Sequence, residues 1–167
     1  PGEIFSQGES LASYDGVDLT GSSLNIYNGG SSIDRQIDLA RSIYAAGVPF
    51  FGSCWAAQVA TVAAGGDVQL NPKGREIGIA RKVALTDAGR DHPLYKGKAS
   101  VFDAICVHKD AITTLPTGAT VLAGNSLSEI QALEIKHDAG IFWGVQYHPE
   151  YDLREVGRVA LRYGDAL

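Results

Sequence analysis

Cys54 stands between a short apolar run and an alanine-rich segment, a position in which a thiol can act as a nucleophile. The segment 52–58 reads Gly-Ser-Cys-Trp-Ala-Ala-Gln, which we interpret as a tight turn from a buried strand into a helix. A nucleophile on such a turn projects from the sheet edge, and the small residues Gly52 and Ala56 allow the turn to close. The N–H groups at the start of the helix favour a thiolate and can bind an oxyanion. On position alone, a buried structural cysteine is an equally good interpretation.

His148 and Glu150 lie two residues apart at the end of an apolar run, in the segment Gly-Val-Gln-Tyr-His-Pro-Glu over 144–150. Alternate residues of an extended chain project to the same side, and Pro149 fixes the bend, so the carboxylate can approach the imidazole. An imidazole held by a carboxylate can take the proton of a thiol. Taken alone, a His-Pro-Glu tripeptide is more often a surface turn. Together with the cysteine, it predicts a nucleophile, a base and a group that orients the base.

The elements that must position these residues are short and are separated by glycines, of which the chain has 20. The apolar run 48–52 predicts a buried strand that leads directly into a helix. Ser31 and Asp34 resemble a capping box at the start of an earlier helix, which Gly47 ends. We expect strands over 14–20, 48–52, 76–86, 100–107, 119–123, 130–136 and 141–147, and helices over 31–46, 55–64 and 152–164. Helices that flank buried strands predict a layered α/β fold.

The composition predicts one soluble globular domain. The 167 residues are 45% hydrophobic and 20% charged, which excludes the disordered, fibrous and membrane classes. A net charge of −5 has the wrong sign for a dedicated binder of nucleic acid or anionic membranes. Two cysteines are too few for a disulfide scaffold, and no window reaches the roughly 18 apolar residues of a membrane helix. We therefore expect a cytoplasmic protein that acts on a small molecule, without a nucleic-acid or membrane partner.

Taken together, the segments resemble those of the class I glutamine amidotransferases. Members of that family carry a Gly-x-Cys-x-Gly-x-Gln elbow and a later His-x-Glu. The matching residues here are Gly52, Cys54, Gln58, His148 and Glu150. Further matching blocks, in the same order, are Tyr14–Ser22, His108-x-Asp110, Leu115-Pro116-x-Gly118 and Gln131-Ala132. The set extends over residues 14–152 and is highly specific.

The resemblance implies a single domain over residues 1–167 with a flavodoxin-like fold, an open, mostly parallel sheet flanked by helices. It implies hydrolysis of the side-chain amide of L-glutamine through a cysteinyl thioester. The released ammonia would go to a partner synthetase, for example one like GMP synthase. No metal or organic cofactor is implied. His92, His108 and His137 lack cysteine or acidic partners at metal-ligand spacing, so we interpret them as structural or surface residues.

The resemblance also implies catalytic roles for particular residues. Cys54 would be the nucleophile that attacks the amide carbon, and His148 would be the general base and then the general acid. Glu150 would orient the imidazole. The backbone N–H groups of Gly21 and Trp55 would form the oxyanion hole.

Substrate contacts implied by the resemblance come from Gln58 and from the backbone near Val107 and Lys109. Two positions depart from the family pattern. Ala56 replaces the glycine two residues after the nucleophile, which adds a methyl group where the elbow is tightest. Val107 replaces a serine, so a side-chain contact at that position is in doubt, whereas a backbone contact is not.

The start of the chain departs further from the family. Members begin with a strand, a helix and a second strand before the Tyr-Asp-Gly block, where this sequence has the thirteen residues Pro1–Ser13 and no Met anywhere. A doubly wound sheet without its first crossover would expose backbone edges. We therefore expect the N-terminal β-α-β unit to be missing and the natural protein to be longer by roughly 30 residues or more.

Two other functions are compatible with these motifs. A γ-glutamyl hydrolase of the same superfamily would share the cysteine, histidine and glutamate, and would pass no ammonia to a partner. A non-catalytic module that binds glutamine would account for Ala56. The segment 73–98 holds seven basic and three acidic residues, which predicts either a docking face for a synthetase or, more simply, a solvated surface.

Overall fold

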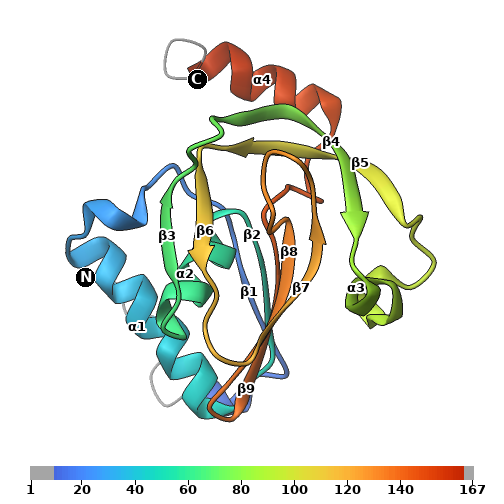
Figure 1. Ribbon diagram of the computed structural model, residues 1–167. Helices are drawn as coiled ribbons and strands as arrows, with labels where there is room; N and C mark the ends of the chain where they lie inside the picture. The colour runs from blue at the N-terminus through green and yellow to red at the C-terminus, as the bar shows by residue number, and fades with distance from the viewer. Residues whose placement is uncertain (1–9, 164–167) are drawn as a thin grey trace.

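The computed structural model of the chain describes residues 10–163, which are organised around a seven-stranded sheet (Figure 1). The strands are β1 (Val17–Leu19), β2 (Phe50–Ser53), β3 (Asp67–Leu70), β4 (Glu76–Leu85), β5 (Val101–His108), β6 (Asp110–Thr114), β7 (Ala119–Gly124), β8 (Ala132–His137) and β9 (Gly140–Val145). The helices are α1 (Ser31–Ala46), α2 (Trp55–Ala63), α3 (Asp87–Asp91) and α4 (Leu153–Tyr163), with 3-10 turns η1 (Leu11–Ser13), η2 (Ile26–Asn28) and η3 (Pro93–Tyr95). The sheet order is β1-β2-β9-β8-β7-β4-β5, and β3 pairs with β6 in a separate ribbon.

The predicted α/β class, with an open sheet flanked by helices, is confirmed. Its parallel part consists of β1, β2 and β9, and the ladders that join β9, β8, β7, β4 and β5 are antiparallel. The connections explain this division. Helix α1 provides the long crossover that parallel neighbours need, whereas β8 and β9 are joined by residues 138–139 alone, a link that only antiparallel strands can use. The sheet is therefore mixed rather than parallel along its whole width.

Helix α1 ends as predicted but begins differently. Gly47 has φ 71°, the left-handed conformation that commonly ends a helix. At the start, Gly30 is the capping residue and no side chain caps the helix, so the predicted capping box is wrong. Ser31 is already helical, and the N–H groups of Ile33 and Asp34 donate to the carbonyl of Gly30. The capping role requires a residue outside the helix, which the sequence pattern placed one position too late.

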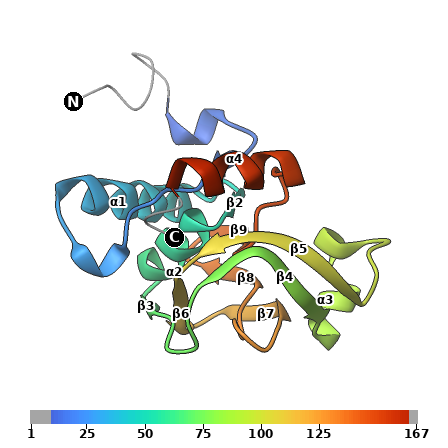
Figure 2. The ribbon, with the colours of Figure 1, turned by 90° about the horizontal axis from the view of Figure 1, so that it is seen from above.

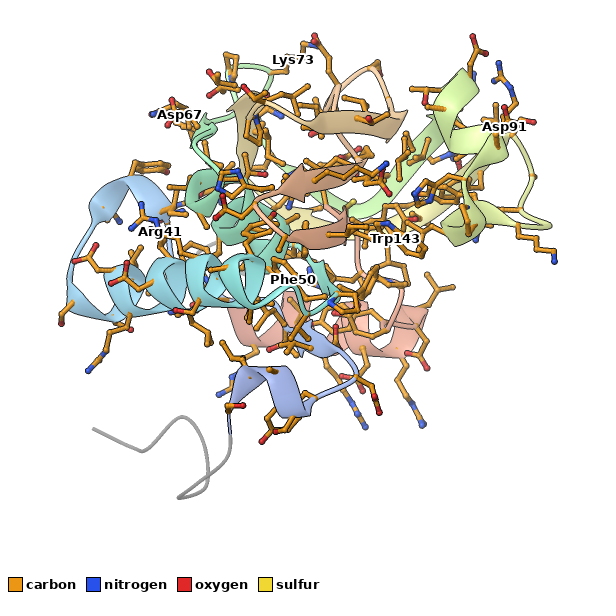
Figure 3. The ribbon with its side chains drawn as sticks, turned by 90° about the horizontal axis from the view of Figure 1, so that it is seen from below. Arg41, Phe50, Asp67, Lys73, Asp91 and Trp143 are labelled. Carbon is orange, nitrogen blue, oxygen red and sulfur yellow. The ribbon has the colours of Figure 1, made fainter. Side chains whose placement is uncertain are left out.

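Helices α1 and α2 lie side by side and cover one face of the sheet (Figure 2). Tyr44 of α1, Phe50 of β2 and Phe142 of β9 are buried in the cluster beneath them, and the ring centroids of Phe50 and Phe142 are 4.7 Å apart. In Figure 3, Phe50 lies inside the molecule, while charged side chains such as Lys73 and Asp91 lie at its rim. A second cluster of buried residues lies between β7–β9 and the long strands β4 and β5. The protein thus has a core on each side of the sheet.

The parallel strands end at one edge of the sheet, on the side where α4 lies in Figure 1. Gly21 follows β1, Cys54 follows β2 and His148 follows β9 within three residues of the strand ends. Ligand sites in open α/β sheets form at such carboxyl edges. Among the described residues, no helix combines the length and apolar character needed to cross a membrane. Two sequence predictions depend partly on residues outside the described part of the chain. They are the departure of Pro1–Ser13 from the family pattern, which involves residues 1–9, and the end of the last helix at Gly164.

Candidate active site

Cys54 occupies a sharp turn between β2 and α2. Its backbone has φ 53° and ψ −108°, a left-handed conformation that is costly for a residue with a side chain. The turn is held because the N–H of Cys54 donates to the carbonyl oxygen of Val145 at 2.8 Å, which ties the elbow to the end of β9. Helix α2 begins at the next residue, Trp55. The strand-turn-helix geometry predicted for this cysteine is present.

Ala56 is accommodated in this elbow. The side chain is 1% exposed, and a Cβ added at Gly52 would lie 2.4 Å from the Cβ of Ala56 and 2.9 Å from the carbonyl oxygen of Leu19. Residue 52 must therefore be glycine, because the methyl group of Ala56 already fills the space beside it. The turn closes with alanine at this position.

His148 is held by a short hydrogen bond to Glu150. Its Nδ1 lies 2.7 Å from Oε1 of Glu150, to which the hydroxyl of Ser53 also donates at 3.1 Å. An Nδ1 that donates to a carboxylate leaves Nε2 as the basic nitrogen. Burial acts to raise the pKa of Glu150, but the hydrogen bonds that its carboxylate accepts, from His148 and Ser53 among others, lower it overall. Tyr151 stacks on the imidazole with ring centroids 4.3 Å apart and planes 5° from parallel.

Gly21 lies between the cysteine and the histidine. A Cβ added there would be 3.2 Å from Cε1 of His148 and 3.8 Å from Cβ of Cys54. The backbone N–H of Trp55 reaches the sulfur of Cys54 and lowers its pKa slightly against the other effects, while the indole of Trp55 points elsewhere and donates to Oε1 of Gln36 at 2.8 Å. The two backbone groups that the sequence predicts for an oxyanion hole thus lie next to the nucleophile.

The resting thiol of Cys54 is protonated. Burial raises its pKa to about 12, the hydrogen bond from Trp55 lowers it, and the negative charges of Glu150 and Asp110 raise it further. The N–H of Trp55 at the start of α2 thus acts in the expected direction and favours the thiolate, but the loss of hydration on burial outweighs it and raises the pKa overall. The thiol points to the carbonyl oxygen of Val107, with Sγ 3.8 Å from that oxygen.

A cavity of about 440 Å³ opens at this edge of the sheet. It is lined by six of the eight residues predicted for the site: Gly21, Cys54, Gln58, Val107, Lys109 and His148. Glu150 and Trp55 contact the lining residues instead. Glu150 is hydrogen-bonded to the imidazole of His148, and the backbone N–H of Trp55 is hydrogen-bonded to the sulfur of Cys54. The side chain of Gln58 donates from Nε2 to Oε1 of Gln146 at 3.3 Å, while Nε2 of the buried Gln146 has no partner among the described residues.

Asp110 also lines the cavity, a residue that the sequence analysis matched to the family but gave no role. Its carboxylate accepts hydrogen bonds from Nδ2 of Asn25 at 2.6 Å and from the hydroxyl of Tyr27 at 3.0 Å. Both donors come from the loop that follows β1 and contains Gly21. Asp110 thereby fixes this loop over the cavity with neutral donors, and its negative charge stays available to a cation. Nothing in the sequence marks Asn25 and Tyr27, because the pairing spans more than 80 residues.

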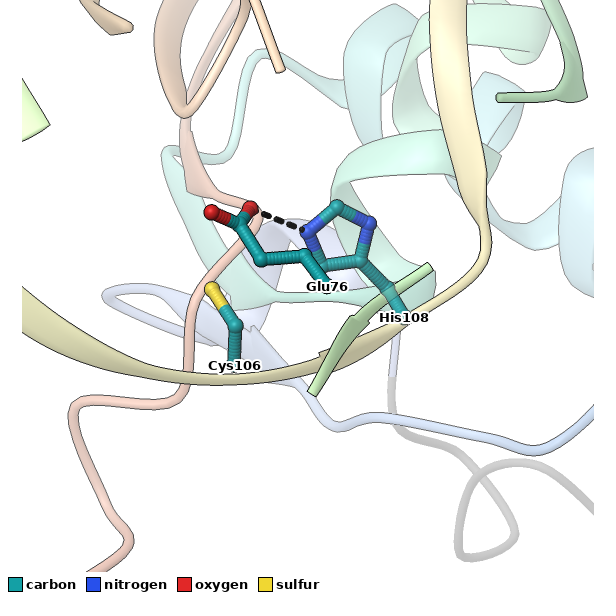
Figure 4. Close-up of side chains that lie close together, drawn as sticks. All are labelled: Glu76, Cys106 and His108. Atoms are coloured by element: carbon teal, nitrogen blue, oxygen red, sulfur yellow. Dashed lines mark hydrogen bonds and ion pairs between the residues drawn. The ribbon is translucent and has the colours of Figure 1, made fainter. Parts of the chain in front are cut away.

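His108 has the thiol and acidic neighbours that its spacing did not suggest. Cys106 lies two positions earlier on the same face of β5, and Glu76 lies opposite on β4, with ligand atoms of the three within 4.8 Å of one another (Figure 4). Nδ1 of His108 is 3.0 Å from the carbonyl oxygen of Asp110, and Nε2 is 3.1 Å from Oε2 of Glu76. A carbonyl can only accept, so Nδ1 carries a proton.

The hydrogen bonds of Glu76 and His108 make the cluster of Glu76, Cys106 and His108 an unfavourable site for a metal ion. Glu76 also accepts hydrogen bonds from Asn125 and Gln131. Burial acts to raise the pKa of Glu76, but the bonds from His108 and Asn125 lower it overall. Both ring nitrogens of His108 thus face hydrogen-bond acceptors within the protein, an arrangement that offers no ring lone pair to a metal ion. Burial, followed by the charge of Glu76, raises the pKa of Cys106 and keeps this thiol neutral.

Comparison with known proteins agrees with this arrangement. A family model described as "Glutamine amidotransferase class-I" matches residues 4–164. The chain is 46% identical over 143 residues to a gamma-glutamyl-L-1-hydroxyisopropylamide hydrolase of Pseudomonas sp., covering 84% of this chain and 48% of the relative, so it spans about half the relative's length. It is 32% identical over 142 residues to a subunit of the glutamine-hydrolyzing GMP synthase of Methanocaldococcus jannaschii, covering 82% of this chain and 69% of that protein.

The fold has close counterparts among solved structures. The crystal structure of a glutamine amidotransferase from Thermotoga maritima superposes with a TM-score of 0.80 at 22% identity, covering 97% of this chain and 67% of that one. This likeness supports the same arrangement of sheet and helices. Together with the match over nearly the whole sequence, it leads to one conclusion. The chain belongs to the class I glutamine amidotransferase family.

Proposed function

We propose that this protein hydrolyses the γ-amide bond of γ-glutamyl compounds, L-glutamine among them, through a thioester on Cys54. One observation carries the proposal. The strained elbow of Cys54 and the hydrogen-bonded pair His148 and Glu150 meet at a single cavity, beside Gly21. A nucleophile, an oriented base and backbone N–H groups close to one point are what acyl transfer requires.

The first half of the reaction forms the thioester. Because the pKa of the resting thiol is about 12, Nε2 of His148 takes the proton of Cys54 while the sulfur attacks the amide carbon. The electron pair of the carbonyl moves onto its oxygen, which the N–H groups of Gly21 and Trp55 stabilise. The carbon–nitrogen bond then breaks, and His148 gives its proton to the departing nitrogen, which leaves as ammonia or as a primary amine.

The second half releases L-glutamate. His148 takes a proton from a water molecule, which attacks the thioester carbon. The carbon–sulfur bond breaks, and the proton returns to the sulfur of Cys54. Glu150 remains ionised throughout and stabilises the imidazolium that forms twice in each cycle.

The γ-glutamyl end of the substrate lies at the polar end of the cavity. Its α-ammonium group faces the buried carboxylate of Asp110, and the backbone of Val107 and Lys109 with the amide of Gln58 contacts the remaining polar atoms. N-substituted amides are included among the substrates because the relative from Pseudomonas is named for hydrolysing one.

The test is release of L-glutamate from L-glutamine and from γ-glutamyl amides by the purified chain. Wild-type protein and the matched control Cys106→Ala, which removes the other buried cysteine, are expected to hydrolyse the substrate. Cys54→Ser is expected to lose at least about a thousandfold in kcat. Equal rates for wild type and Cys54→Ser would refute the proposal.

A second function, supply of ammonia to a synthetase, is supported by the likeness to part of an archaeal GMP synthase. The predicted docking segment 73–98 gives it little support, since Lys73, Arg81 and Arg90 pair with acidic residues of this chain. Hydrolysis of glutamine that rises when the ATPase component of a GMP synthase is added with its nucleotide substrates would favour ammonia supply. A rate that does not respond would favour the free-standing hydrolase.

A further inference from the structure

The cavity has an apolar wall that the γ-glutamyl group does not use. We propose that Ile77, Tyr151 and Val159 form a subsite for an alkyl group on the scissile amide nitrogen, so that the enzyme prefers γ-glutamyl amides of small alkylamines to L-glutamine. This inference rests on the proposed function and adds to it the class of leaving group. The three residues come from β4, from the segment that follows Glu150 and from α4, none of which supplies the nucleophile or the base.

The wall lies on the leaving-group side of the site. The amide nitrogen must accept its proton from His148, so a substituent on that nitrogen lies against the imidazole and its neighbours. Tyr151 is one of these neighbours, because its ring stacks on the imidazole with ring centroids 4.3 Å apart. Ile77 and Val159 line the same cavity. A substituent next to Tyr151 therefore has an aliphatic surface from β4 and α4 to pack against.

These side chains are incompletely covered in the described structure. Ile77 is 38% exposed, and Val159 is partly buried. An alkyl group that covers them removes apolar surface from water, whereas the ammonia released from L-glutamine covers none. One methylene group in an apolar pocket changes kcat/KM by roughly tenfold or more. The wall thus separates substrates by the substituent on nitrogen and not by the γ-glutamyl group that they share.

The size of the cavity is consistent with a substituted amide. A cavity of about 440 Å³ is within the size range of small-molecule sites, which extends to ligands much larger than L-glutamine. The reaction stays balanced with such a substrate: the carbon–nitrogen bond breaks, His148 protonates the nitrogen, a primary amine leaves, and one water molecule is consumed in hydrolysing the thioester.

A positively charged lining residue favours a different leaving group, which the experiment must separate from the alkylamine. Arg75 also lines the cavity and would favour an amine that carries a carboxylate, as in a γ-glutamyl dipeptide. γ-Glutamylisopropylamide and γ-glutamyl-L-alanine have leaving groups of similar size and differ in that carboxylate. The apolar wall predicts a higher kcat/KM for the isopropylamide.

The experiment measures kcat/KM for L-glutamine, γ-glutamylisopropylamide and γ-glutamyl-L-alanine. Wild type is expected to favour the isopropylamide over L-glutamine by about tenfold or more. Ile77→Ala and Val159→Ala are each expected to lower the ratio of these two values by roughly fivefold to tenfold. Ile79→Ala and Val156→Ala are matched controls on the same strand and helix, at positions that do not line the cavity, and the ratio is expected to stay unchanged.

The possible failures are distinct. If L-glutamine is hydrolysed at least as fast as the isopropylamide, or if the alanine dipeptide is favoured, the subsite is refuted while the hydrolase stands. The same holds if Ile77→Ala and Val159→Ala behave like their controls. If no γ-glutamyl amide is hydrolysed by wild type, the proposed function fails and the subsite with it. Thermal unfolding of each variant identifies loss of folding, and Ile77→Val and Val159→Thr then serve as milder replacements with the same expected direction.

Discussion

The methyl group of Ala56 lies against the backbone of Gly52, where a Cβ would come within 2.4 Å of it. This contact explains how the elbow tolerates alanine at a position where the family pattern has glycine. Residues 52 and 56 pack against each other, with room for one methyl group between them. In this protein the methyl group belongs to Ala56, at the start of α2. The left-handed backbone of Cys54 persists with this methyl group present.

Gly52→Ala is therefore expected to destabilise the protein and to reduce its activity. The added methyl group would also meet the carbonyl oxygen of Leu19 at 2.9 Å, and backbone cannot move aside as a flexible side chain can. We expect a loss of about 2 to 3 kcal/mol in the free energy of unfolding. Gly157→Ala is a control, since a Cβ at Gly157 meets no atom within 4 Å and alanine favours a helix. Denaturant unfolding of both variants provides the measurement, and equal stability would contradict the packing argument.

Gly21→Ala tests the position of the imidazole. The new methyl group would lie 3.2 Å from Cε1 of His148, tighter than ordinary contact, so the ring must shift by a few tenths of an ångström. Because proton transfer depends on the position of that ring, we expect kcat to fall by roughly tenfold to a hundredfold, with a smaller change in KM. Steady-state kinetics on L-glutamine measure the two constants. A change confined to KM would argue against the proximity of Gly21 to the general base.

Alkylation of Cys54 should report its high pKa. A thiol with a pKa of about 12 forms tenfold more thiolate for each unit by which the pH rises toward that value. The rate of carboxamidomethylation at Cys54 in the free enzyme is expected to keep rising from pH 7 to about pH 10. Over this range it can be checked that the enzyme is still folded. Peptide mass spectrometry distinguishes Cys54 from the fully buried Cys106. A rate that reaches a plateau below about pH 8 would mean that a thiolate is already present at rest.

Asp110→Asn is expected to weaken substrate binding. In the proposed binding mode this carboxylate faces the α-ammonium group, and removing its charge is expected to cost about 2 to 3 kcal/mol, or a roughly thirtyfold to 150-fold rise in KM. The side chain keeps its size. Asp103→Asn is the control, because Asp103 is about half exposed and pairs with Arg81 away from the cavity. Similar KM values for the two variants would remove Asp110 from the binding site.

Glu76→Gln tests the buried hydrogen bonds of the Glu76 carboxylate. Removing its charge is expected to reduce the free energy of unfolding by about 2 to 3 kcal/mol at neutral pH, because the bonds to His108, Asn125 and Gln131 lose a charged acceptor. The folded-state pKa of Glu76 is lowered from 4.5, so its stabilising effect is fully present above pH 4.5 and is lost as pH falls through the lower folded value. The difference between wild type and variant should shrink on acidification below that range. A difference that does not depend on pH would indicate that Glu76 is neutral in the folded protein.

The local sequence pattern predicted most of the helices and strands that depend only on neighbouring residues. The apolar run before Cys54, the alanine-rich helix after it and the end of α1 at Gly47 are confirmed, because each depends on residues within a few positions of one another. The ribbon of β3 and β6 was not predicted. Its strands are four and five residues long, and each is stabilised by pairing with a distant segment rather than by its own pattern.

The candidate site likewise contains residues that local spacing predicted and residues that it could not predict. The motifs of Cys54 and His148 can be found in the sequence because spacing fixes the elbow and the strand end. Asn25 and Tyr27 could not be found, since their contact with Asp110 exists only once the loop after β1 lies against the start of β6. The hydrogen bond between His108 and Glu76 likewise depends on strand register, which places the two residues opposite each other on β4 and β5. Long-range pairing decides these contacts.

The central claim is that Cys54 carries the γ-glutamyl group during the reaction. Rapid acid quench of the enzyme turning over a γ-glutamyl amide, followed by mass spectrometry of the peptide that contains Cys54, tests this most directly. We predict a γ-glutamyl adduct on Cys54 of the wild-type enzyme that is absent in Cys54→Ser and strongly reduced in His148→Asn, because the same imidazole is needed to form the thioester. Release of L-glutamate by wild type with no adduct on Cys54 would contradict the account.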